Sequence, residues 1–431
     1  MEQSLQHLLE NSQKAYQNWK RVSFADRQKY FAQLSKILLS KKEELGKIIT
    51  TEMHKPISQS IAEIEKCAGM CDFYANCENV LATQKIPSEY GISEIHFESM
   101  GIILGVMPWN YPFWQALRFA VPTILAGNVV ALKHASICSN SASKMEELFL
   151  EAGFPKLIFT HYEISHSEVE EILGNPVIKG VSLTGSEEAG RKIAEIAGRN
   201  LKKSVLELGG NDAFIVCEDA NIEEAAKKAA LGRLQNNGQT CVAAKRFIIH
   251  STIWAEFLPN FLEEYQKYQP KNPMDSTTVF SKMSREDLAQ DLENQYQKAL
   301  ENGAEIILPL EKIAESTFKP GILMMNENNP INDEELFGPL AMVFVADSDE
   351  ALLAKANSTK FGLGNSVWTT SADRAQFFIE NLESGMVAVN QITKSDARFP
   401  FGGTKNSGYG VELSTMALHE FTTTKTVLGK I

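Results

Sequence analysis

The first part of the chain has apolar residues spaced for helices. Apolar positions recur three or four residues apart over residues 8–20, 23–55 and 58–82, and this spacing predicts three helices. Ser23 is a candidate cap for the second helix. Pro56 separates the second helix from the third, because proline restricts the residue before it to extended conformations. We expect these helices to pack against a sheet.

The middle of the chain changes to short, continuous apolar runs. Residues 88–98 first alternate in polarity and contain strand-favouring residues, which predicts an extended segment or hairpin. Apolar runs follow, separated from one another by helical patterns. This alternation is typical of buried parallel strands joined by crossovers, and it predicts an open, doubly wound α/β unit of the Rossmann type. The runs cover residues 101–108, 127–133, 156–161, 180–186 and 204–210.

The second half of the chain repeats this alternation. Strand and helix patterns continue after residue 207, so we expect a second α/β unit over residues 208–400. The tail, residues 421–430, alternates and is rich in β-branched residues, which predicts an edge strand. Such a strand either pairs within its own chain or adds to another subunit.

Composition and charge exclude several classes of protein. The chain has 431 residues and a formal net charge of −12, which disfavours nucleic acid and anionic membranes as partners. No apolar run approaches the roughly 18 residues of a membrane helix, and the N-terminal segment lacks the pattern of a signal peptide. We therefore expect a cytoplasmic protein.

The six cysteines do not form a disulfide framework in so long a chain. Cys67 and Cys71 have a spacing that suits a metal, but no companion pair of ligands is evident. We expect them to be small buried residues, and the sequence supports no metal site.

One further cysteine stands where its side chain is expected to be accessible. Cys241 follows Gly238 and Gln239 and precedes small residues in the run QNNGQTCVAAK. A thiolate is a good nucleophile toward a carbonyl carbon. Glu207 ends a predicted apolar strand, where a charged residue is costly unless it is used or paired. Its carboxylate is therefore a candidate base for the thiol or for a water, and a structural ion pair is the alternative.

Other candidates lie at the ends of the predicted strands, where α/β proteins build their sites. Asn110 directly follows the first apolar run. Its amide can hydrogen-bond an oxyanion, or it can be a turn residue. Gly185 and Ser186 form a glycine turn before a helix, and the N-terminus of that helix can meet a phosphate.

The runs LELGGND around Glu207 and NGQTC around Cys241 resemble the paired signatures of the aldehyde dehydrogenase superfamily. The resemblance covers nearly the whole chain. It implies NAD(P)-dependent oxidation of an aldehyde to a carboxylic acid through a thiohemiacetal and a thioester on Cys241. By this resemblance Glu207 is the base that activates water, and Asn110 holds the oxyanion.

The resemblance also implies where the cofactor binds. Members that prefer NAD commonly carry a glutamate at the position of Ser136, where it bonds the ribose hydroxyls. A serine does not repel a 2′-phosphate and Lys133 attracts one, so NADP is favoured and NAD is not excluded. The expected cofactor contacts are Trp109, Lys133, Ser136, Gly185, Ser186, Leu208, Glu335 and Phe337.

The sequence looks most like the short succinate-semialdehyde dehydrogenase group, so succinate semialdehyde is the first substrate hypothesis. Arg118 lies where this group carries an arginine for the distal carboxylate; a salt bridge on a helix surface is the alternative. Gln235 replaces a second arginine of better-known members. Arg398 is a candidate substitute, and a different aldehyde is the other explanation. Phe401 is expected to line the pocket.

The resemblance assigns roles to the predicted domains. We expect a dinucleotide-binding domain over residues 1–84 and 101–207, and a catalytic domain over residues 208–400. Residues 85–100 and 415–431 are expected to be the strands of an oligomerisation arm, in a homodimer or homotetramer.

Three rival readings remain. They are a CoA-acylating enzyme, a non-catalytic structural protein on the same scaffold, and a cysteine hydrolase without a redox cofactor. The retained Glu207 disfavours the first, and the complete set of Cys241, Glu207 and Asn110 disfavours the second. No histidine occurs in the motifs around Cys241 and Glu207, which disfavours the third.

Overall fold

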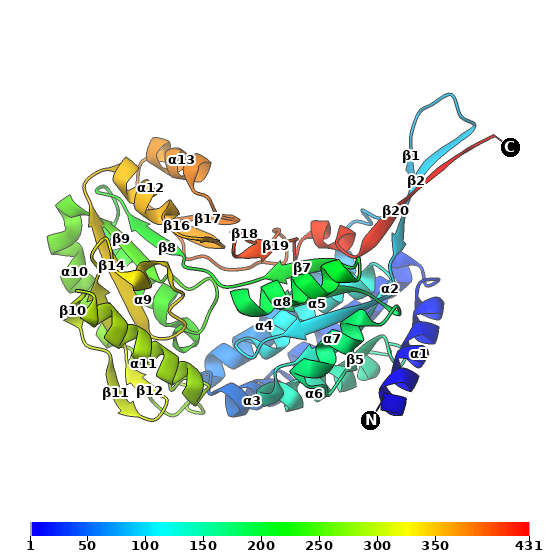
Figure 1. Cartoon of the computed structure of the whole chain (residues 1–431), viewed down its shortest axis with the longest axis horizontal. Coiled ribbons are helices and arrows are strands. Elements are labelled where there is room, and N and C mark those ends of the chain that lie inside the picture. Colours follow the sequence, from blue (N-terminus) through cyan, green and yellow to red (C-terminus); the bar gives the residue numbers. More distant parts are fainter. Residues whose placement is uncertain (1, 431) are drawn as a thin grey trace.

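Two lobes and a projecting arm make up the chain in the computed structural model, which describes residues 2–430 (Figure 1). Met1 and Ile431, the outer ends of the predicted ranges 1–84 and 415–431, lie outside the described residues. Each lobe is built around its own sheet, and the arm is a third, smaller sheet. The expected fold, two α/β units with a small β arm, is confirmed.

The N-terminal helices differ from the prediction at one point. Ser23 caps α2 as expected, since its hydroxyl accepts a hydrogen bond from the backbone N–H of Asp26 at 3.1 Å. The single helix predicted over residues 23–55 is wrong, because Lys41 leaves the helical region at φ −112° and ψ 12°. Apolar spacing continues across this break, so periodicity does not reveal it. The helices are α1 (Glu2–Trp19), α2 (Phe24–Ser40), α3 (Lys42–Met53) and α4 (Ile57–Asn76).

The first lobe contains a six-stranded sheet in the order β19-β7-β6-β3-β4-β5. The chain runs outward from β3 to β5 and then returns to place β6 on the other side of β3. Ligands of open α/β sheets bind at the carboxyl ends of the strands beside such a reversal. The five parallel strands are β3 (Ile102–Met107), β4 (Val129–His134), β5 (Phe159–His161), β6 (Ile178–Thr184) and β7 (Lys203–Glu207).

Helices connect these strands, and a late segment of the chain completes the sheet. The short strand β19 (Gly408–Tyr409) pairs antiparallel with β7, and the 3₁₀-helix η4 (Thr415–His419) follows it. Residues from the end of the chain are thereby brought back to the first lobe. The connecting helices are α5 (Pro112–Leu125), α6 (Ser139–Glu151), α7 (His166–Gly174) and α8 (Glu187–Arg199).

The second lobe contains a seven-stranded sheet in the order β10-β13-β14-β9-β8-β16-β17. Only β10 runs antiparallel to its neighbour. Its strands are β8 (Ala213–Val216), β9 (Arg246–His250), β10 (Glu305–Leu308), β13 (Gly321–Met324), β14 (Leu340–Ala346), β16 (Gly364–Trp368) and β17 (Met386–Val389). Its helices are α9 (Ile222–Leu234), α10 (Ser251–Gln266), α11 (Glu286–Glu301), α12 (Asp349–Asn357) and α13 (Ala372–Asn381). Two small ladders, β11 (Glu311–Ala314) with β12 (Thr317–Lys319) and β15 (Phe361–Gly362) with β18 (Thr404–Lys405), complete this half.

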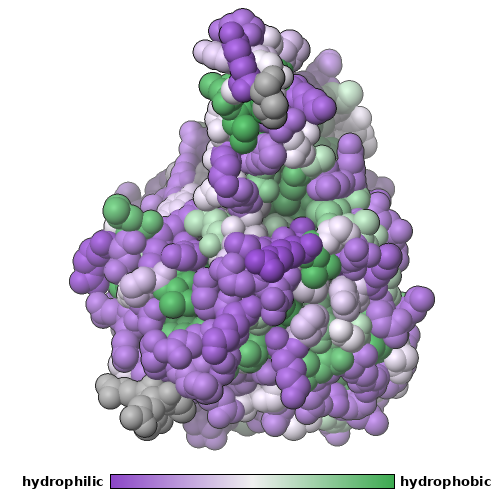
Figure 2. Space-filling model, turned by 90° about the vertical axis from the view of Figure 1, so that its right-hand side faces the viewer, coloured by the Kyte–Doolittle hydropathy of each residue, from purple (hydrophilic) through white to green (hydrophobic). Residues whose placement is uncertain are grey.

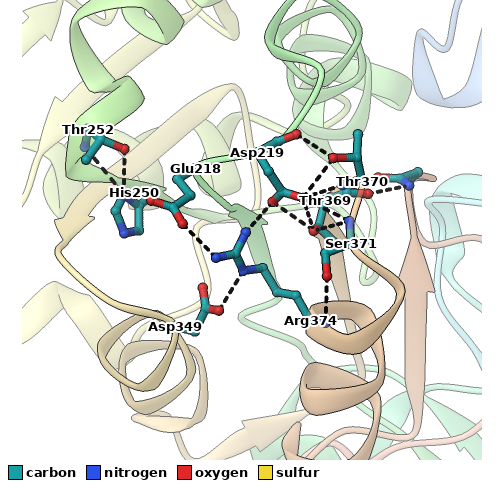
Figure 3. Close-up of polar contacts among 10 residues, drawn as sticks. Glu218, Asp219, His250, Thr252, Asp349, Thr369, Thr370, Ser371 and Arg374 are labelled. Carbon is teal, nitrogen blue, oxygen red and sulfur yellow. Dashed lines mark hydrogen bonds and ion pairs between the residues drawn. The ribbon is translucent and has the colours of Figure 1, made fainter.

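A polar network ties the loops at one edge of the second sheet (Figure 3). Asp219, after β8, accepts hydrogen bonds from residues 369–371, after β16. Arg374 pairs with Glu218, Asp219 and Asp349 at 2.6 to 2.8 Å. Burial would raise the pKa of Asp219, but these hydrogen bonds hold it below its ordinary value. The carboxylates at this edge are therefore engaged in holding the loops together.

The arm consists of β1 (Gln84–Lys85), β2 (Ile92–Ser99) and β20 (Thr422–Gly429), with β2 in the middle. Of the two possibilities for the tail, pairing within the chain is observed: β20 runs antiparallel to β2, from Ser99 opposite Thr422 to Ile92 opposite Gly429. The arm stands out from the first lobe (Figure 1), and green, hydrophobic side chains show on its surface (Figure 2).

Candidate active site

The loop that carries Cys241 has an unusual backbone. Between α9 and β9 the chain passes through three consecutive left-handed residues, Asn236 at φ 53°, Asn237 at φ 57° and Gly238 at φ 76°. Asparagine and glycine tolerate this conformation better than other residues. A side chain at Gly238 would also meet the carbonyl of Gly338 at 2.5 Å. The run Asn-Asn-Gly is therefore required to turn the chain sharply just before the cysteine.

Hydrogen bonds fix this loop. Asn236 donates through Nδ2 to the carbonyl oxygen of Asn110 at 2.8 Å. The buried Lys245 donates through Nζ to the carbonyl of Thr240 at 3.1 Å and to that of Cys241. Its charge is paired with Glu335 at 3.2 Å. The backbone of the cysteine is thus held in place from both sides.

Glu207 lies at the end of β7 and is 2% exposed. One of its carboxylate oxygens accepts a hydrogen bond from Arg118 at 2.9 Å, and the nearby Cys241 thiol acts with Arg118 to lower the pKa of the carboxylate. Burial raises the pKa of Glu207, while the charge of Arg118 opposes this shift. Burial, followed by the charge of Glu207, raises the pKa of Cys241. The resting pair is a neutral thiol beside a base.

Arg118 is buried on α5 and pairs with two carboxylates. Besides Glu207, its guanidinium meets Glu412 at 2.5 Å, and it donates to the hydroxyl of Thr184 at 3.2 Å. The alternative prediction, a salt bridge on the helix surface, is wrong in its location because the side chain is 2% exposed. Burial raises the pKa of Glu412 to about 7. Sequence reasoning missed Glu412, because a lone glutamate after a glycine-rich loop carries no signal.

Asn110 points its amide toward the cysteine loop. Its Nδ2 donates to the carbonyl of Gln239 at 3.0 Å, two residues before Cys241. Its Oδ1 accepts a hydrogen bond from Nε2 of Gln115 at 2.9 Å. Gln115 therefore fixes which way the Asn110 amide faces, and this leaves the second N–H of Asn110 for a ligand. Gln115 was also missed, although it lies in the same short segment.

Two cavities meet at Cys241. A groove of about 930 Å³ runs along the carboxyl ends of the first sheet, and a smaller cavity of about 200 Å³ lies on the other side of the cysteine. Of the expected cofactor contacts, the groove is lined by Trp109, Lys133, Gly185, Ser186, Leu208, Glu335 and Phe337. Of the expected substrate contacts, the small cavity is lined by Arg118, Gln235 and Phe401.

The groove has features that fit a dinucleotide. Ser186 caps α8 beside the strand reversal, so a helix N-terminus faces the groove where a phosphate would bind. Lys133 is 5% exposed, and no carboxylate in the described part of the chain pairs with its ammonium. A buried cation without a counter-charge fits an anionic ligand. Trp109 and Phe337 meet edge to face at 5.9 Å near the cysteine end.

Two sequence candidates lie outside both cavities. Ser136 is exposed and is not among the residues that line the groove. Arg398 is turned away from the small cavity because Asp396, two residues earlier, binds its guanidinium at 2.7 Å at the surface. Spacing along a loop does not show which neighbour a long side chain will choose.

The small cavity contains polar residues that sequence reasoning missed. Lys66 on α4 and Lys394 line its wall, together with Trp114 and Ser395. Lys66 gave no signal because a lysine on an amphipathic helix is usually solvated. Phe401 packs against Arg118, with the guanidinium 4.7 Å from the ring centre.

Residues 2–430 contain no group of three or more His, Cys, Asp and Glu side chains arranged to hold a metal ion. No helix in this part of the chain is long and apolar enough to cross a membrane.

Comparison with known proteins adds to this geometry. The sequence matches the aldehyde dehydrogenase family over residues 2–427. It is 40% identical, over 97% of this chain and 93% of the relative, to a probable NADP(+) succinate-semialdehyde dehydrogenase of Synechocystis sp.. It is 38% identical, over 98% of this chain and 92% of the relative, to the NAD(P)+ succinate semialdehyde dehydrogenase Sad of Escherichia coli.

A solved structure agrees with these relatives. Succinic semialdehyde dehydrogenase from Streptococcus pyogenes, in complex with NADP+, matches with a TM-score of 0.97 and 33% identity, over 100% of this chain and 96% of that one. Sequence and fold agree over the whole length of the molecule. The chain therefore belongs to the aldehyde dehydrogenase family, whose members oxidise aldehydes with NAD(P).

Proposed function

We propose that this enzyme oxidises succinate semialdehyde to succinate and prefers NADP. The observation that carries the proposal is the small cavity beside Cys241, which is about 200 Å³ and has Arg118, Lys66 and Lys394 in its wall. Its lining includes one carboxylate, Glu63, whose charge is already paired with Lys55. A short aldehyde with an anionic far end fits this cavity. The relatives that bear this name support the same substrate.

The first step is addition of the thiol to the aldehyde. Sγ of Cys241 bonds to the carbonyl carbon, and its proton passes to Glu207, which lines the same groove. The carbonyl oxygen becomes an oxyanion in a thiohemiacetal. The free N–H of Asn110, oriented by Gln115, donates to it. Each donor is fixed before the reaction, so little reorganisation is needed.

Oxidation follows in the groove. The bound nicotinamide cofactor supplies a hydride acceptor, and the loss of hydride from the substrate carbon leaves a thioester on Cys241. The protein's contribution is orientation: Lys245 holds the carbonyl of Cys241 and, through Glu335, links the cysteine loop to the groove wall. The reacting carbon is thereby kept between the two cavities.

Hydrolysis completes the cycle. Glu207 first releases to solvent the proton that it took from Cys241. Its carboxylate then removes a proton from a water that attacks the thioester carbonyl. The C–S bond breaks, this proton passes to the departing thiolate of Cys241, and the carboxylic acid is released. Arg118 holds the Glu207 carboxylate in place at 2.9 Å. Glu412, on the other side of Arg118, has a pKa raised by burial to about 7, so it can exchange a proton near neutral pH.

The preference for NADP rests on Lys133. Its buried ammonium has no carboxylate partner within residues 2–430, and an exposed serine stands at position 136 instead of an acidic residue. A 2′-phosphate would supply the missing anion.

The test is the absorbance of the reduced nicotinamide, followed with purified enzyme. Succinate semialdehyde and butyraldehyde are supplied in turn, each with NADP and with NAD. We expect turnover with succinate semialdehyde and NADP to exceed the other combinations. Faster turnover of butyraldehyde would point to another small or medium aldehyde. No turnover in any combination would favour an acylating or a non-catalytic protein.

A further inference from the structure

Arg118 is poorly placed to attract the distal carboxylate of a substrate. Its guanidinium already contacts Glu207 at 2.9 Å and Glu412 at 2.5 Å. With Glu207 ionised, the cluster of these three side chains carries no net positive charge, whether or not Glu412 is protonated. A third carboxylate would therefore gain little electrostatic energy at Arg118.

Lys66 in the same cavity has no such partner. Its Nζ donates to the hydroxyl oxygen of Ser395 at 2.8 Å and lies 3.9 Å from the ring centre of Trp114. Neither neighbour carries a negative charge. Among the described residues no carboxylate lies within ion-pair distance of this ammonium. Lys66 is therefore a partly buried, uncompensated cation in a cavity that also contains Cys241.

The nearest carboxylate on the same helix is already occupied. Glu63 pairs with the buried Lys55 at 2.5 Å and accepts hydrogen bonds from the backbone N–H groups of Phe113 and Trp114 at 2.9 and 3.0 Å. These contacts engage both oxygens of Glu63, so its charge acts on Lys66 only from beyond ion-pair distance.

The surroundings also fix the position of the ammonium. Ser395 accepts a hydrogen bond from Trp114 Nε1 at 3.1 Å as well as from Lys66. The serine therefore connects the indole and the ammonium. The flexible lysine stem loses little further freedom when a ligand binds, which favours affinity.

We propose that Lys66, and not Arg118, is the residue that binds the distal carboxylate and sets the preference for acidic aldehydes. This inference rests on the proposed function, because it names a residue that selects the substrate. Arg118 then serves to hold Glu207 and Glu412. The group that discriminates between anionic and neutral aldehydes lies on α4, the helix that also carries Glu63.

The pH dependence of binding follows from the same site. Burial and the charge of Arg118 lower the pKa of Lys66 to about 8, while Cys67, Glu63 and Cys241 act in the opposite direction. Lys66 is charged below this pH and neutral above it. The Michaelis constant for succinate semialdehyde should therefore rise as the pH increases through about 8. That for butyraldehyde should not follow the same curve.

The direct test is Lys66→Met, which keeps a long apolar stem against Trp114 and removes the charge. We expect the Michaelis constant for succinate semialdehyde to rise at least about tenfold, equivalent to about 1.4 kcal/mol, with little change for butyraldehyde. Lys66→Arg should restore much of the selectivity. Lys36→Met is the matched control, since Lys36 is exposed on α2 and lines neither cavity.

The outcomes separate the two proposals. Slow oxidation of succinate semialdehyde by the wild-type enzyme would count against the proposed function itself. Efficient oxidation by wild type together with an unchanged Michaelis constant in Lys66→Met would overturn the role of Lys66 alone. An equal loss for both aldehydes would also overturn it, because it would indicate a structural effect.

Discussion

A single buried arginine holds the two carboxylates of the proposed acid–base chemistry. Arg118 contacts both Glu207 and Glu412, and all three side chains are almost completely buried. Glu207 has to be ionised to activate water, and burial alone would oppose that. The positive charge of Arg118 offsets part of this cost. The base therefore depends on a partner that does not itself touch the reacting atoms.

The role of Glu207 can be separated from that of the nucleophile by kinetics. We expect Glu207→Gln to lower the steady-state rate by roughly 10²-fold or more, because a general base is lost. The thioester should still form, but more slowly because Glu207 no longer takes the thiol proton, so a slower first burst of reduced cofactor should remain in a stopped-flow experiment. Cys241→Ala is the control and should show no burst. A steady-state rate close to wild type in Glu207→Gln would contradict the assignment.

The cofactor preference can be tested at Lys133. We expect Lys133→Met to weaken binding of NADPH roughly tenfold, about 1.4 kcal/mol, and to affect NADH much less. The reason is that only the former carries the 2′-phosphate. Titration of the cofactor fluorescence measures both affinities. Ser136→Glu provides a second variant, which should weaken the binding of NADPH by charge repulsion. If Lys133→Met loses the same affinity for NADPH and for NADH, Lys133 does not have this role.

Glu412 predicts a pH effect on stability. Burial raises its pKa from 4.5 to about 7 in the folded protein, so between these values the folded state binds more protons than the unfolded state. Its contribution to stability therefore declines as the pH rises through this window. Glu412→Gln lacks this decline. Relative to wild type, the variant should gain roughly 2 kcal/mol between pH 5.5 and 8.

Thermal unfolding of both proteins at the two pH values measures this difference. The comparison between variant and wild type cancels the other titrating groups, including His134, whose pKa is lowered by burial to about 4. A difference that stays constant with pH would show that the pKa of Glu412 is not raised.

The site residues that sequence reasoning found share one property: their signals are local. Cys241, Glu207 and Asn110 each stand in a short motif next to a predicted strand end, and the structure brings all three to the junction of the two cavities. Glu412 and Lys66 are joined to the site by contacts between distant segments. Such contacts depend on the tertiary fold, and no local pattern reports them.

At the scale of elements, the position of α5 links structure to chemistry. This helix carries Gln115 and Arg118 and begins just after Asn110. Its first backbone N–H groups donate to the carboxylate of Glu63, which pairs with the buried Lys55. A buried ion pair between Glu63 of α4 and Lys55, just before this helix, thus satisfies the N-terminus of α5 and fixes the position of Asn110, the proposed oxyanion donor.

Removing one partner of this pair should be costly. We expect Glu63→Gln to lower the free energy of unfolding by roughly 3 kcal/mol or more, because Lys55 would be left as a buried, unpaired charge. The double variant Lys55→Met, Glu63→Met should recover much of that loss. Glu65 lies on the same helix as Glu63 and forms an exposed pair with Lys42 of α3. Glu65→Gln breaks this pair and should cost less than about 1 kcal/mol. Denaturant unfolding measures all three, and equal losses at Glu63 and Glu65 would contradict this account.

Elements were predicted well where pattern and burial agree. The continuous apolar runs became the buried parallel strands of the first sheet, such as β3 and β4, because both faces of these strands are covered. The break at Lys41 was missed because apolar positions keep their spacing through it. Strand order was also beyond reach: hydrophobic pattern indicates that β6 is buried, but not that it returns to the far side of β3.

At the scale of the molecule, the catalytic groups come from both lobes. Glu207 ends a strand of the first sheet, whereas Cys241 follows α9 of the second lobe. The late segment that includes β19 returns to the first lobe, where Phe401 lines the small cavity and Glu412 pairs with Arg118. The site exists only when the lobes are closely packed. Because the site residues are far apart in the chain, many backbone contacts have to hold them in position.

The arm gives the last prediction. It leaves large apolar side chains in solvent: Leu428 in β20 is 54% exposed, and Ile86 and Tyr90, between β1 and β2, are 43% and 45% exposed. The arm pairs two strands of eight residues with one of two, and such a ribbon without a covering layer is marginally stable in water. Exposed edges also favour pairing with another chain. We therefore expect the arm to pack against a second copy.

Light scattering of variants measures this. Leu428→Lys should shift the molecular mass toward that of the monomer. Leu201→Lys is the control and should leave the mass unchanged, because this leucine just after α8 is 96% exposed. A wild-type protein that already has the mass of one chain would show that the arm is stable alone, and its apolar side chains would then need another explanation.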